Sequence, residues 1–471
     1  MVRRAGISKP WRSPAQALGA AQSLGIRVRC GAKPGGVFPS GGARFIVRGM
    51  AAHLSVTVCI VGAGPVGATL ACLLAEAGIP AAVIDRSALP PMELPAFDGR
   101  AYAIALTSRD VLEQAGVWAR LGGAPCPIRQ IRVSDGRVGR PASPLFLHFA
   151  ASEVGEDAFG WMVEARHLRI ALNAQLPRLP GLAVFAPASV SSVARTPETA
   201  EVRLADGTVI ACRLVVAAEG RESALRAEAG IPVTRWDYGQ QAIVCAVRHE
   251  RPHGHVAVEH FLPGGPFAIL PLPGEPGPGG APDGRTSAIV WSDRSDLVDR
   301  VWELSPGRFA AELARRFGDH LGTVTPVGTR WRYPLSALLA QRYTDIRLAL
   351  VGDAAHGIHP IAGQGLNLGV RDVGALGAAI IEAVRSGEDP GSPAVLARYQ
   401  AARRPANLAM LAMTDALDRL FSNDLAPVRL ARGFGLAAVH RIPPLKRLFM
   451  RTAMGLSPQG LSILGALRQA A

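Results

Sequence analysis

The stretch LSVTVCIVGAGPVGATLACLLAEAG, at Leu54–Gly78, decides the fold. Leu54–Val61 is a continuous apolar run with β-branched residues, which predicts a buried parallel strand. The glycine-rich turn Gly62–Gly67 follows. Ala68–Ala77 then predicts a helix of Ala and Leu that ends at Gly78, a residue typical of a helix C-cap. Strand, glycine turn and helix in this order predict the start of a βαβ unit.

The glycine turn has the spacing G-x-G-x-x-G of a dinucleotide site. Gly62 permits a tight turn, Gly64 lets the backbone approach a pyrophosphate, and Gly67 lets the helix pack closely on the strand. The pyrophosphate would lie at the helix N-terminus, beside Pro65 and Val66, where free N–H groups and the helix dipole attract it. The alternative is a turn needed only for packing.

A second predicted strand, Ala81–Ile84, ends at Asp85, 18 residues after Gly67. A carboxylate at this place can bind a ribose hydroxyl, and Arg86 beside it is a further cofactor candidate. The pattern therefore predicts dinucleotide binding, but by itself it does not separate FAD from NAD.

Length and composition limit the classes of protein. The chain has 471 residues, 49% of them hydrophobic, which predicts two or three domains with large cores. We expect no transmembrane helix, because no run of about 18 uncharged apolar residues occurs. Six scattered cysteines without a C-x-x-C pair predict neither a disulfide framework nor a zinc site, and they favour a reducing compartment.

The net charge of +14 lies at the two ends of the chain. Residues 1–50 contain nine Arg or Lys and residues 425–471 contain seven, with no acidic residue in either segment, so the body between them is close to neutral. We therefore expect no nucleic-acid binding by the core. Residues 1–50 have the Arg-rich, acid-free composition of a transit peptide. The alternative is translation from Met50, and in both cases we expect disorder there.

The chain then alternates between two kinds of pattern. Asp206-Gly207, between Val202–Leu204 and Thr208–Leu214, predicts a hairpin. We expect an α/β fold in which a Rossmann-type dinucleotide-binding domain is interleaved with a mixed β-sheet substrate domain and followed by helices from about Gly365. The predicted divisions are an extension at 1–50, dinucleotide segments at 54–125, 161–232 and 336–410, substrate segments at 126–160 and 233–335, and a helical segment at 411–471.

A second glycine-rich stretch, RLALVGDAAHGIHPIAGQGLNLGVRD at 347–372, points to a flavin. A carboxylate after a strand can accept a hydrogen bond from a ribityl or ribose hydroxyl, and N–H groups at a helix start can stabilise negative charge on a reduced flavin ring. The stretch resembles the ribityl motif of the single-component flavin monooxygenases. Its H-P-x-A-G-Q-G-x-N-L-G-x-R-D form is similar to the ubiquinone-biosynthesis hydroxylases. The cofactor candidates here are Asp353, Pro360, Gly363, Gly365, Leu366 and Asn367.

Two further stretches, Ala217–Arg226 and Asp98–Trp118, resemble this family. Ala217–Arg226 (AAEGRESALR) resembles its D-G-x-x-S-x-x-R motif, which touches FAD and NAD(P)H, and gives Glu219 and Arg221 as candidates. Glu219 stands where the family has Asp, which puts nicotinamide handling in question. The alternative is a strand followed by a capped helix. The resemblance also implies that Arg100 contacts the FAD phosphate or ribose.

The resemblance covers roughly residues 55–460 and implies a p-hydroxybenzoate hydroxylase-like fold, whose Rossmann-type FAD-binding domain is the dinucleotide domain predicted above. It implies that NAD(P)H reduces FAD, that O₂ adds at flavin C4a, and that the resulting hydroperoxide hydroxylates the ring of a polyprenylated phenol. No catalytic acid/base pair is required, and none is assigned. The alternatives are a same-fold hydroxylase of a soluble aromatic acid and a non-catalytic flavin subunit of a biosynthetic complex.

The basic C-terminal segment, Leu425–Ala471, places cations among Leu, Phe and Met. It is a candidate for contact with an anionic membrane or a partner protein, the alternative being ordinary packed helices. We expect a cytoplasmic protein at the inner face of the membrane, or a mitochondrial matrix protein if residues 1–50 are a transit peptide.

Several histidines have simpler explanations than metal binding. No known ligand spacing occurs, so no metal is expected, and exposed histidines on a strand–turn–strand are the prediction for four of them. His356 and His359 flank the flavin motif, where one of them is a candidate to face the cofactor and packing is the alternative. The four clustered histidines are His249, His253, His255 and His260.

Overall fold

The computed structural model describes residues 27–30, 52–89, 99–139, 146–277, 280–421, 441–456, 465 and 467. The predictions for the rest of residues 1–50 and for much of 425–471 lie outside these ranges. Within the described ranges, none of the helices has both the length and the apolarity that a membrane span requires.

A six-stranded sheet forms the dinucleotide-binding half, in the order β10-β4-β3-β14-β21-β20. Five strands run parallel and β20 is antiparallel to β21. The apolar strands are buried because helices cover both faces, as parallel sheets require. The strands are β3 (Val58–Val61), β4 (Ala81–Ile84), β10 (Leu182–Phe185), β14 (Leu214–Ala217), β20 (Thr344–Asp345) and β21 (Leu348–Leu350).

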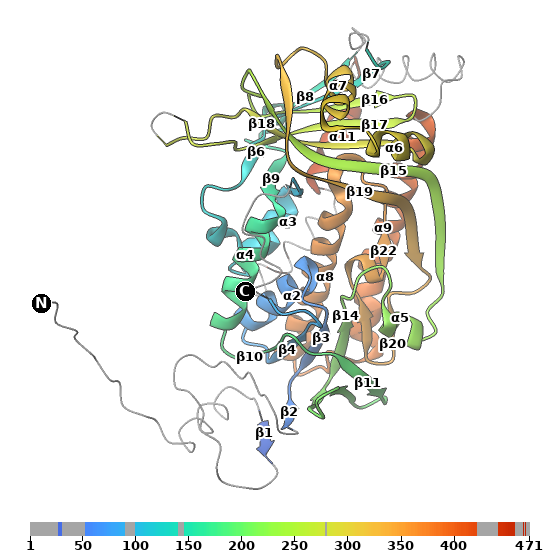
Figure 1. The fold of residues 1–471 in the computed structure, drawn as a ribbon. Helices are drawn as coiled ribbons and strands as arrows, with labels where there is room; N and C mark the ends of the chain where they lie inside the picture. The colour runs from blue at the N-terminus through green and yellow to red at the C-terminus, as the bar shows by residue number, and fades with distance from the viewer. Residues whose placement is uncertain are drawn as a thin grey trace, which may run out of the picture.

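An eight-stranded sheet forms the other half, in the order β22-β19-β15-β18-β17-β16-β7-β8. It lies at the top of Figure 1, with the dinucleotide sheet below and two long helices, α8 (Gln364–Arg385) and α9 (Pro393–Phe421), between them. The strands are β7 (Gln130–Asp135), β8 (Phe146–Ala150), β15 (Val233–His249), β16 (Val256–Leu262), β17 (Gly265–Leu272), β18 (Thr286–Arg294), β19 (Val324–Ala340) and β22 (His356–Gly357).

Two smaller sheets complete the β structure. One has the order β1-β2-β13-β12-β11 and the other has the order β5-β9-β6. Their strands are β1 (Arg27–Cys30), β2 (Ala52–Ser55), β11 (Val190–Arg195), β12 (Ala200–Leu204), β13 (Val209–Cys212), β5 (Ala101–Ala105), β6 (Cys126–Ile128) and β9 (Gly160–Glu164).

The helices divide between the two halves. Helices α6 and α7 cover one face of the large sheet, where Trp291 and Phe309 pack in a common core. Helix α8 is buried along most of its length, and Gly377 lets Leu73 of α2 approach it. The α-helices are α2 (Pro65–Glu76), α3 (Leu106–Gln114), α4 (Ala165–Gln175), α5 (Ala224–Glu228), α6 (Ser295–Trp302), α7 (Pro306–Phe317), α8 (Gln364–Arg385), α9 (Pro393–Phe421) and α11 (Pro443–Met454). Short 3₁₀ turns lie at Trp118–Leu121, Ala151–Val154, Leu176–Arg178, Gly352–Ala354 and Ile361–Gly363.

The predicted hairpin at Asp206-Gly207 is confirmed as the antiparallel pair β12 and β13. The prediction of a single strand over Leu54–Val61 is wrong, because the run is divided between β2 and β3 in different sheets. The backbone changes partner at this point: Val56 N donates to Ala211 O of β13, whereas Thr57 N donates to Pro80 O beside β4. The change of partner leaves the apolar pattern continuous, so it is invisible in the sequence.

The expectation of exposed histidines is also wrong, because three of the four are buried and His255 is half-buried. His249, His253 and His260 are buried, and each has a ring nitrogen within hydrogen-bond distance of a neighbour. The partners are the Ser287 hydroxyl, the Leu272 carbonyl and the Ser134 hydroxyl. These rings therefore satisfy polar groups inside the large-sheet half.

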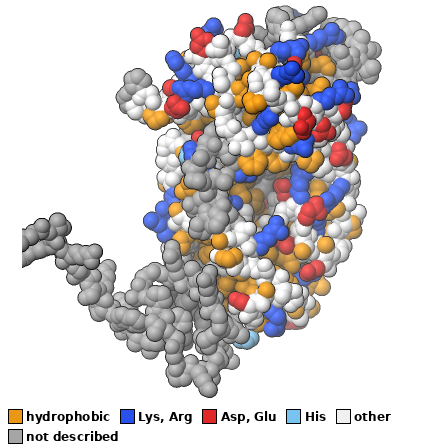
Figure 2. Space-filling view, in the orientation of Figure 1, with side chains coloured by type: hydrophobic (Ala, Val, Ile, Leu, Met, Phe, Trp, Pro, Cys, Tyr) orange, Lys and Arg blue, Asp and Glu red, His pale blue; other side chains and the backbone are white. Residues whose placement is uncertain are grey.

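Charges of both signs are mixed over the face shown in Figure 2, without a broad patch of one sign. This agrees with a near-neutral body between two basic ends.

Gly67 provides a test of the glycine turn as a packing contact. A Cβ added to Gly67 would lie 1.9 Å from the Gly62 carbonyl oxygen and 2.9 Å from the Ala218 Cβ. Gly67→Ala is therefore expected to destabilise the FAD-free protein by about 3 kcal/mol or more, because backbone must move. Thermal unfolding measures the loss.

The matched control is Gly64→Ala, three residues earlier. Gly64 has a φ of −58° and no atom within 4 Å of an added Cβ. The unfolding free energy of this variant, without FAD, should lie within about 1 kcal/mol of the wild-type value. Equal losses in the two variants would contradict the packing argument.

Candidate active site

A cavity of about 1670 Å³ lies between the two halves of the molecule. Its wall includes the glycine turn, the loop after β21, the large sheet, α9 and α11. A single small-molecule site usually occupies about 300–1,000 Å³. The cavity therefore has room for a dinucleotide and a second molecule in contact with it.

The glycine turn is shaped for a close backbone approach. Gly62 has a φ of +104°, and a Cβ there would lie 2.4 Å from the Ala218 carbonyl oxygen. Gly64 is open to the cavity, and Pro65 and Val66 begin α2 beside it. The first N–H groups of a helix lack helical partners, so this end of α2 fits a pyrophosphate.

Asp85 braces this turn. Its carboxylate accepts hydrogen bonds from Ala63 N and Ser87 N, each at 2.8 Å. A carboxylate has further lone pairs, and the group faces the cavity, so it is placed to bind a ribose hydroxyl as well. Arg86 also lines the cavity and is exposed.

The loop after β21 carries the other cofactor candidates. Asp353 lies on the 3₁₀ turn Gly352–Ala354, about half exposed toward the cavity. Pro360, Gly363, Gly365 and Leu366 follow along the same wall. Gly363 has a φ of +62°, and nothing lies within 4 Å of a Cβ added to Gly365. The start of α8 is thus open to a ligand, as Gly64 is.

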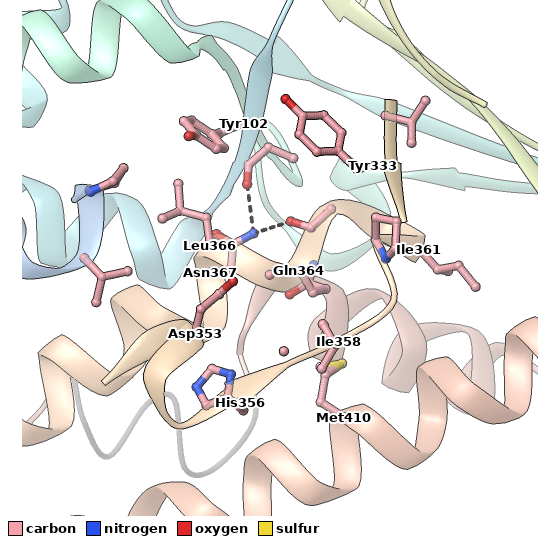
Figure 3. Close-up of a pocket in the computed structure, with 18 of the residues that line it drawn as sticks. Tyr102, Tyr333, Asp353, His356, Ile358, Ile361, Gln364, Leu366, Asn367 and Met410 are labelled. Atoms are coloured by element: carbon pink, nitrogen blue, oxygen red, sulfur yellow. Dashed lines mark hydrogen bonds between the residues drawn. The ribbon is translucent and has the colours of Figure 1, made fainter. Parts of the chain in front are cut away.

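Asn367 fastens this loop to β5. Its Nδ2 donates to the carbonyls of Ala103 and Gly363, at 2.8 and 3.1 Å (Figure 3). Its Oδ1 accepts from Ala105 N at 2.8 Å. The side chain is therefore occupied by backbone groups. What Asn367 offers a flavin is the position of the loop and of its own backbone at the helix start.

The third motif is tied to this loop. The Glu219 carboxylate accepts from the Ser223 hydroxyl at 2.6 Å and from Leu225 N at 3.2 Å, so it holds the start of α5. Arg221 donates to the Ser336 carbonyl at 3.0 Å and lies 3.3 Å from Asp353. Both Glu219 and Arg221 line the cavity.

Arg226 of the same motif is buried. It donates to Ala354 O at 2.9 Å and Arg221 O at 2.7 Å, which joins the motif to the loop after β21.

Two arginines differ from the sequence analysis: Arg100 lies away from the described cavity wall, and Arg169 contacts the glycine turn. The Arg100 guanidinium lies 4.6 Å from the centroid of the Trp331 ring, and Arg100 is not part of the described cavity wall. Its contact with FAD stays a prediction. Arg169 of α4, which sequence reasoning missed, donates to Ala63 O at 2.6 Å and so holds the glycine turn. Only the fold brings α4 beside this turn.

A buried carboxylate, Asp372, lies beneath the cofactor loop. It accepts from Gly352 N at 3.1 Å and Arg403 Nε at 2.8 Å, and it lies 2.5 Å from His356 Nε2. Asn407 adds a fourth contact at 3.1 Å. Burial acts to raise the pKa of Asp372, but His356 and Arg403 outweigh burial and lower this pKa to about 2.

The two histidines of the motif both hold the loop in place. His356 lies on the cavity wall below Asp353 (Figure 3), with its Nε2 directed to Asp372. His359 is fully buried, 3.1 Å from Gln240 Oε1, and its ring lies 5.0 Å from that of Tyr238. Burial lowers the pKa of His359, and Asp418 opposes the shift.

The far part of the cavity is an apolar chamber, formed by one face of the large sheet and by α9 and α11. Tyr333 and Met410 mark its border with the cofactor loop (Figure 3). Among the described wall residues from β7, β8, β15–β18, α9 and α11 there is no Arg or Lys. The chamber suits an uncharged, apolar ligand.

The residues present fit FAD. Two open glycine positions, Gly64 and Gly365, lie at two helix N-termini on one cavity wall, with Asp85 and Asp353 placed for hydroxyl groups. FAD, when bound, supplies redox chemistry that protein side chains lack.

Asp372→Asn tests the support of the loop. Removing one charge from a buried, paired set is expected to cost about 3–5 kcal/mol of unfolding free energy. Because the folded pKa lies below the ordinary 3.8, the stabilisation is full above about pH 4 and is lost as the pH falls toward 2. Denaturant unfolding at pH 3 and pH 6 measures the difference from wild type. Asp157→Asn, at an exposed carboxylate, is the control. A variant as stable as wild type at pH 6 would contradict the prediction.

Comparisons with known proteins agree with this geometry. The model of the FAD binding domain family matches residues 55–414. Ubiquinone hydroxylase UbiL of Rhodospirillum rubrum is 53% identical over 398 residues, which covers 84% of this chain and 89% of that protein. The 3-demethoxyubiquinol 3-hydroxylase of Escherichia coli is 35% identical, covering 85% of this chain and 98% of that protein.

Solved structures show the same fold at lower identity. PqsL of Pseudomonas aeruginosa, a probable FAD-dependent monooxygenase, has a TM-score of 0.66 at 24% identity, covering 81% of this chain and all of that chain. The p-nitrophenol 4-monooxygenase PnpA of Pseudomonas putida has a TM-score of 0.67 at 17% identity, covering 85% and 98%. The predicted α/β fold of the p-hydroxybenzoate hydroxylase type is confirmed, and the chain belongs to the FAD-dependent aromatic monooxygenases, in the branch that contains the ubiquinone hydroxylases.

Proposed function

We propose that this chain hydroxylates the aromatic ring of a polyprenylated phenol in ubiquinone biosynthesis, using FAD, NAD(P)H and O₂. One observation carries the proposal: a single cavity joins the two open glycine positions, Gly64 and Gly365, to an apolar chamber. The ring to be hydroxylated must lie beside the flavin, and this cavity lets two ligands meet there.

The chain's own residues bind the cofactor, position the loop beside it and exclude water. The N-terminus of α2 and Asp85 would hold the dinucleotide, while Asn367 and Asp372 fix the loop beside the place where the flavin would bind. The N–H groups at the start of α8 would stabilise negative charge on a bound flavin. The apolar chamber excludes water from the space beside it.

The chamber favours a prenylated phenol over a soluble aromatic acid. A buried carboxylate ligand would need a cation, and the described chamber wall offers none. Arg86 and Arg221, the two cations among the wall residues that the structure describes, lie in the dinucleotide half. A non-catalytic role rested on Glu219, yet Glu219 still holds the start of α5 and still faces the cavity.

A deletion strain tests the proposal. Its quinone pool, analysed by mass spectrometry, is expected to contain a prenylated phenol lacking one oxygen, and wild-type protein should restore the pool. The Gly64→Ala/Asp353→Ala double variant should leave at least tenfold less product, because it loses the pyrophosphate approach and a ribityl contact. A normal pool in a strain with no second hydroxylase, or full rescue by the double variant, would contradict catalysis by this chain.

We also propose that the protein contacts the membrane near α11, because its substrate is dissolved in lipid. Leu448 and Phe449 are 61% and 41% exposed, next to the exposed Arg447 and Arg451, whereas Lys446 pairs with Glu153. Phe449 also lines the cavity. Exposed apolar groups among cations are typical of contact with an anionic surface. We place the protein at the cytoplasmic face of the membrane, or in the matrix if residues 1–50 are a transit peptide.

Vesicle sedimentation tests the membrane contact. Leu448→Ser/Phe449→Ser is expected to lower binding to vesicles of anionic phospholipid about tenfold, since two apolar side chains no longer enter the interface. Ile170→Ser is the matched control, because Ile170 is 41% exposed on α4, away from α11. Equal binding by both variants would place the contact elsewhere.

A further inference from the structure

One carboxyl group interrupts the apolar chamber. Glu259 lies on β16, and its side chain lines the cavity. Among the described wall residues from β7, β8, β15–β18, α9 and α11 it is the one ionisable side chain. Among the described residues, none forms a hydrogen bond or ion pair with its carboxyl.

The sheet register places Glu259 in the middle of an apolar row. Side chains alternate between the two faces of a strand, and paired residues on neighbouring strands share a face. Glu259 pairs with Val133 on one side and with Ala268 on the other. The row across the sheet reads Leu147, Val133, Glu259, Ala268, Val290 and Val244. All six line the cavity.

Packing connects this row to the cofactor loop. The Ala103 Cβ lies 3.0 Å from where a Cβ on Gly363 would be, and Ala103 packs against the apolar cluster that contains Ala257. Ala257 is two residues from Glu259 on the same face of β16. The wall that carries Glu259 is therefore continuous with the wall beside the cofactor loop, and both face the same cavity.

The surroundings favour the neutral form of the carboxyl. Burial raises the pKa of Glu259 to about 7, with no charged neighbour contributing. The helices across the chamber present Met413, Leu417, Met450 and other uncharged residues. Asp135, two residues beyond Val133 on β7, is not part of the described cavity wall. A neutral carboxyl both donates and accepts a hydrogen bond.

We propose that Glu259 is a positioning residue for the substrate, whose carboxyl hydrogen-bonds an oxygen substituent of the phenolic ring and thereby selects the ring carbon that is hydroxylated. The inference rests on the proposed function and extends it. Contacts between an apolar wall and the prenyl chain are not directional, whereas one hydrogen bond would fix the rotation of the ring. A site built around such a bond also rejects a ring that lacks the oxygen.

Binding to the FAD-loaded protein tests the anchor. The probe is a phenol with a short isoprenyl chain, and its dissociation constant is read from the flavin absorbance at pH 6 and pH 8.5 without NAD(P)H. Wild-type affinity is expected to fall at least tenfold at the higher pH, because the carboxyl ionises above pH 7. Glu259→Gln should bind like wild type at pH 6 and lose the pH dependence. Glu259→Leu should bind about tenfold more weakly at pH 6.

The outcomes separate the anchor from the function. Three outcomes would overturn the anchor alone. The first is a dissociation constant for Glu259→Leu equal to that of wild type at pH 6. The others are a pH dependence of binding that is retained in Glu259→Gln, or a wild-type affinity that rises above pH 7. A wild-type protein that binds no phenol would overturn both. Glu198→Leu, at an exposed glutamate, is the control for surface effects. A changed ratio of hydroxylated isomers in Glu259→Leu, with FAD retained, would support the selection of the ring carbon.

Thermal unfolding gives a reading that needs no substrate. A carboxyl whose pKa is raised in the folded state destabilises the fold progressively as the pH rises from the ordinary 4.5 through about 7. Glu259→Gln should therefore unfold at a higher temperature than wild type at pH 8.5, with a smaller difference at pH 5.5. An equal difference in unfolding temperature between the variant and wild type at both pH values would overturn the claim that the Glu259 pKa is raised.

Discussion

The buried carboxylate of Asp372 is the contact on which the cofactor loop depends. It lies on α8 and gathers Gly352 N, His356 and the α9 residue Arg403 around two oxygens. The strand end, the loop and two helices are thereby fixed to one point. Asp353 follows Gly352 directly, so the direction of its side chain is set by a carboxylate that never reaches the cavity. A carboxylate removed from water destabilises the fold unless all its charge is paired, so the loop is held where these partners reach Asp372.

The parts of the site that could be predicted are those whose reason is local. Gly62 and Gly67 are needed because the turn, strand and helix touch within a few residues, and their close contacts agree with that argument. The motif around Asp353 was likewise recognisable as a continuous stretch. The fold class followed from the same local patterns, and the related structures confirm it.

The parts that escaped prediction depend on partners far along the chain. Asn367 was identified as a cofactor candidate, but its bonds to Ala103 and Ala105 cross more than 260 residues. Arg169 reaches the glycine turn from 106 residues away, and no motif marks it. The division of Leu54–Val61 between two sheets had the same cause. Periodicity reports which residues are buried and says nothing about which strand lies beside them.

The cavity also explains how interleaved segments divide the chemistry. The dinucleotide half contributes backbone N–H groups, glycines and carboxylates, which suit phosphates and hydroxyl groups. The large sheet contributes an apolar face with Glu259 alone in its row. An apolar wall can hold a lipid-like ring close to a flavin and exclude water, but it cannot orient that ring, since dispersion contacts are weakly directional. Orientation requires at least one polar group, and that group must be neutral to be tolerated where no cation faces it. A carboxylic acid with a raised pKa meets both requirements, whereas a lysine or an ionised aspartate in the same row would remain a buried, unpaired charge.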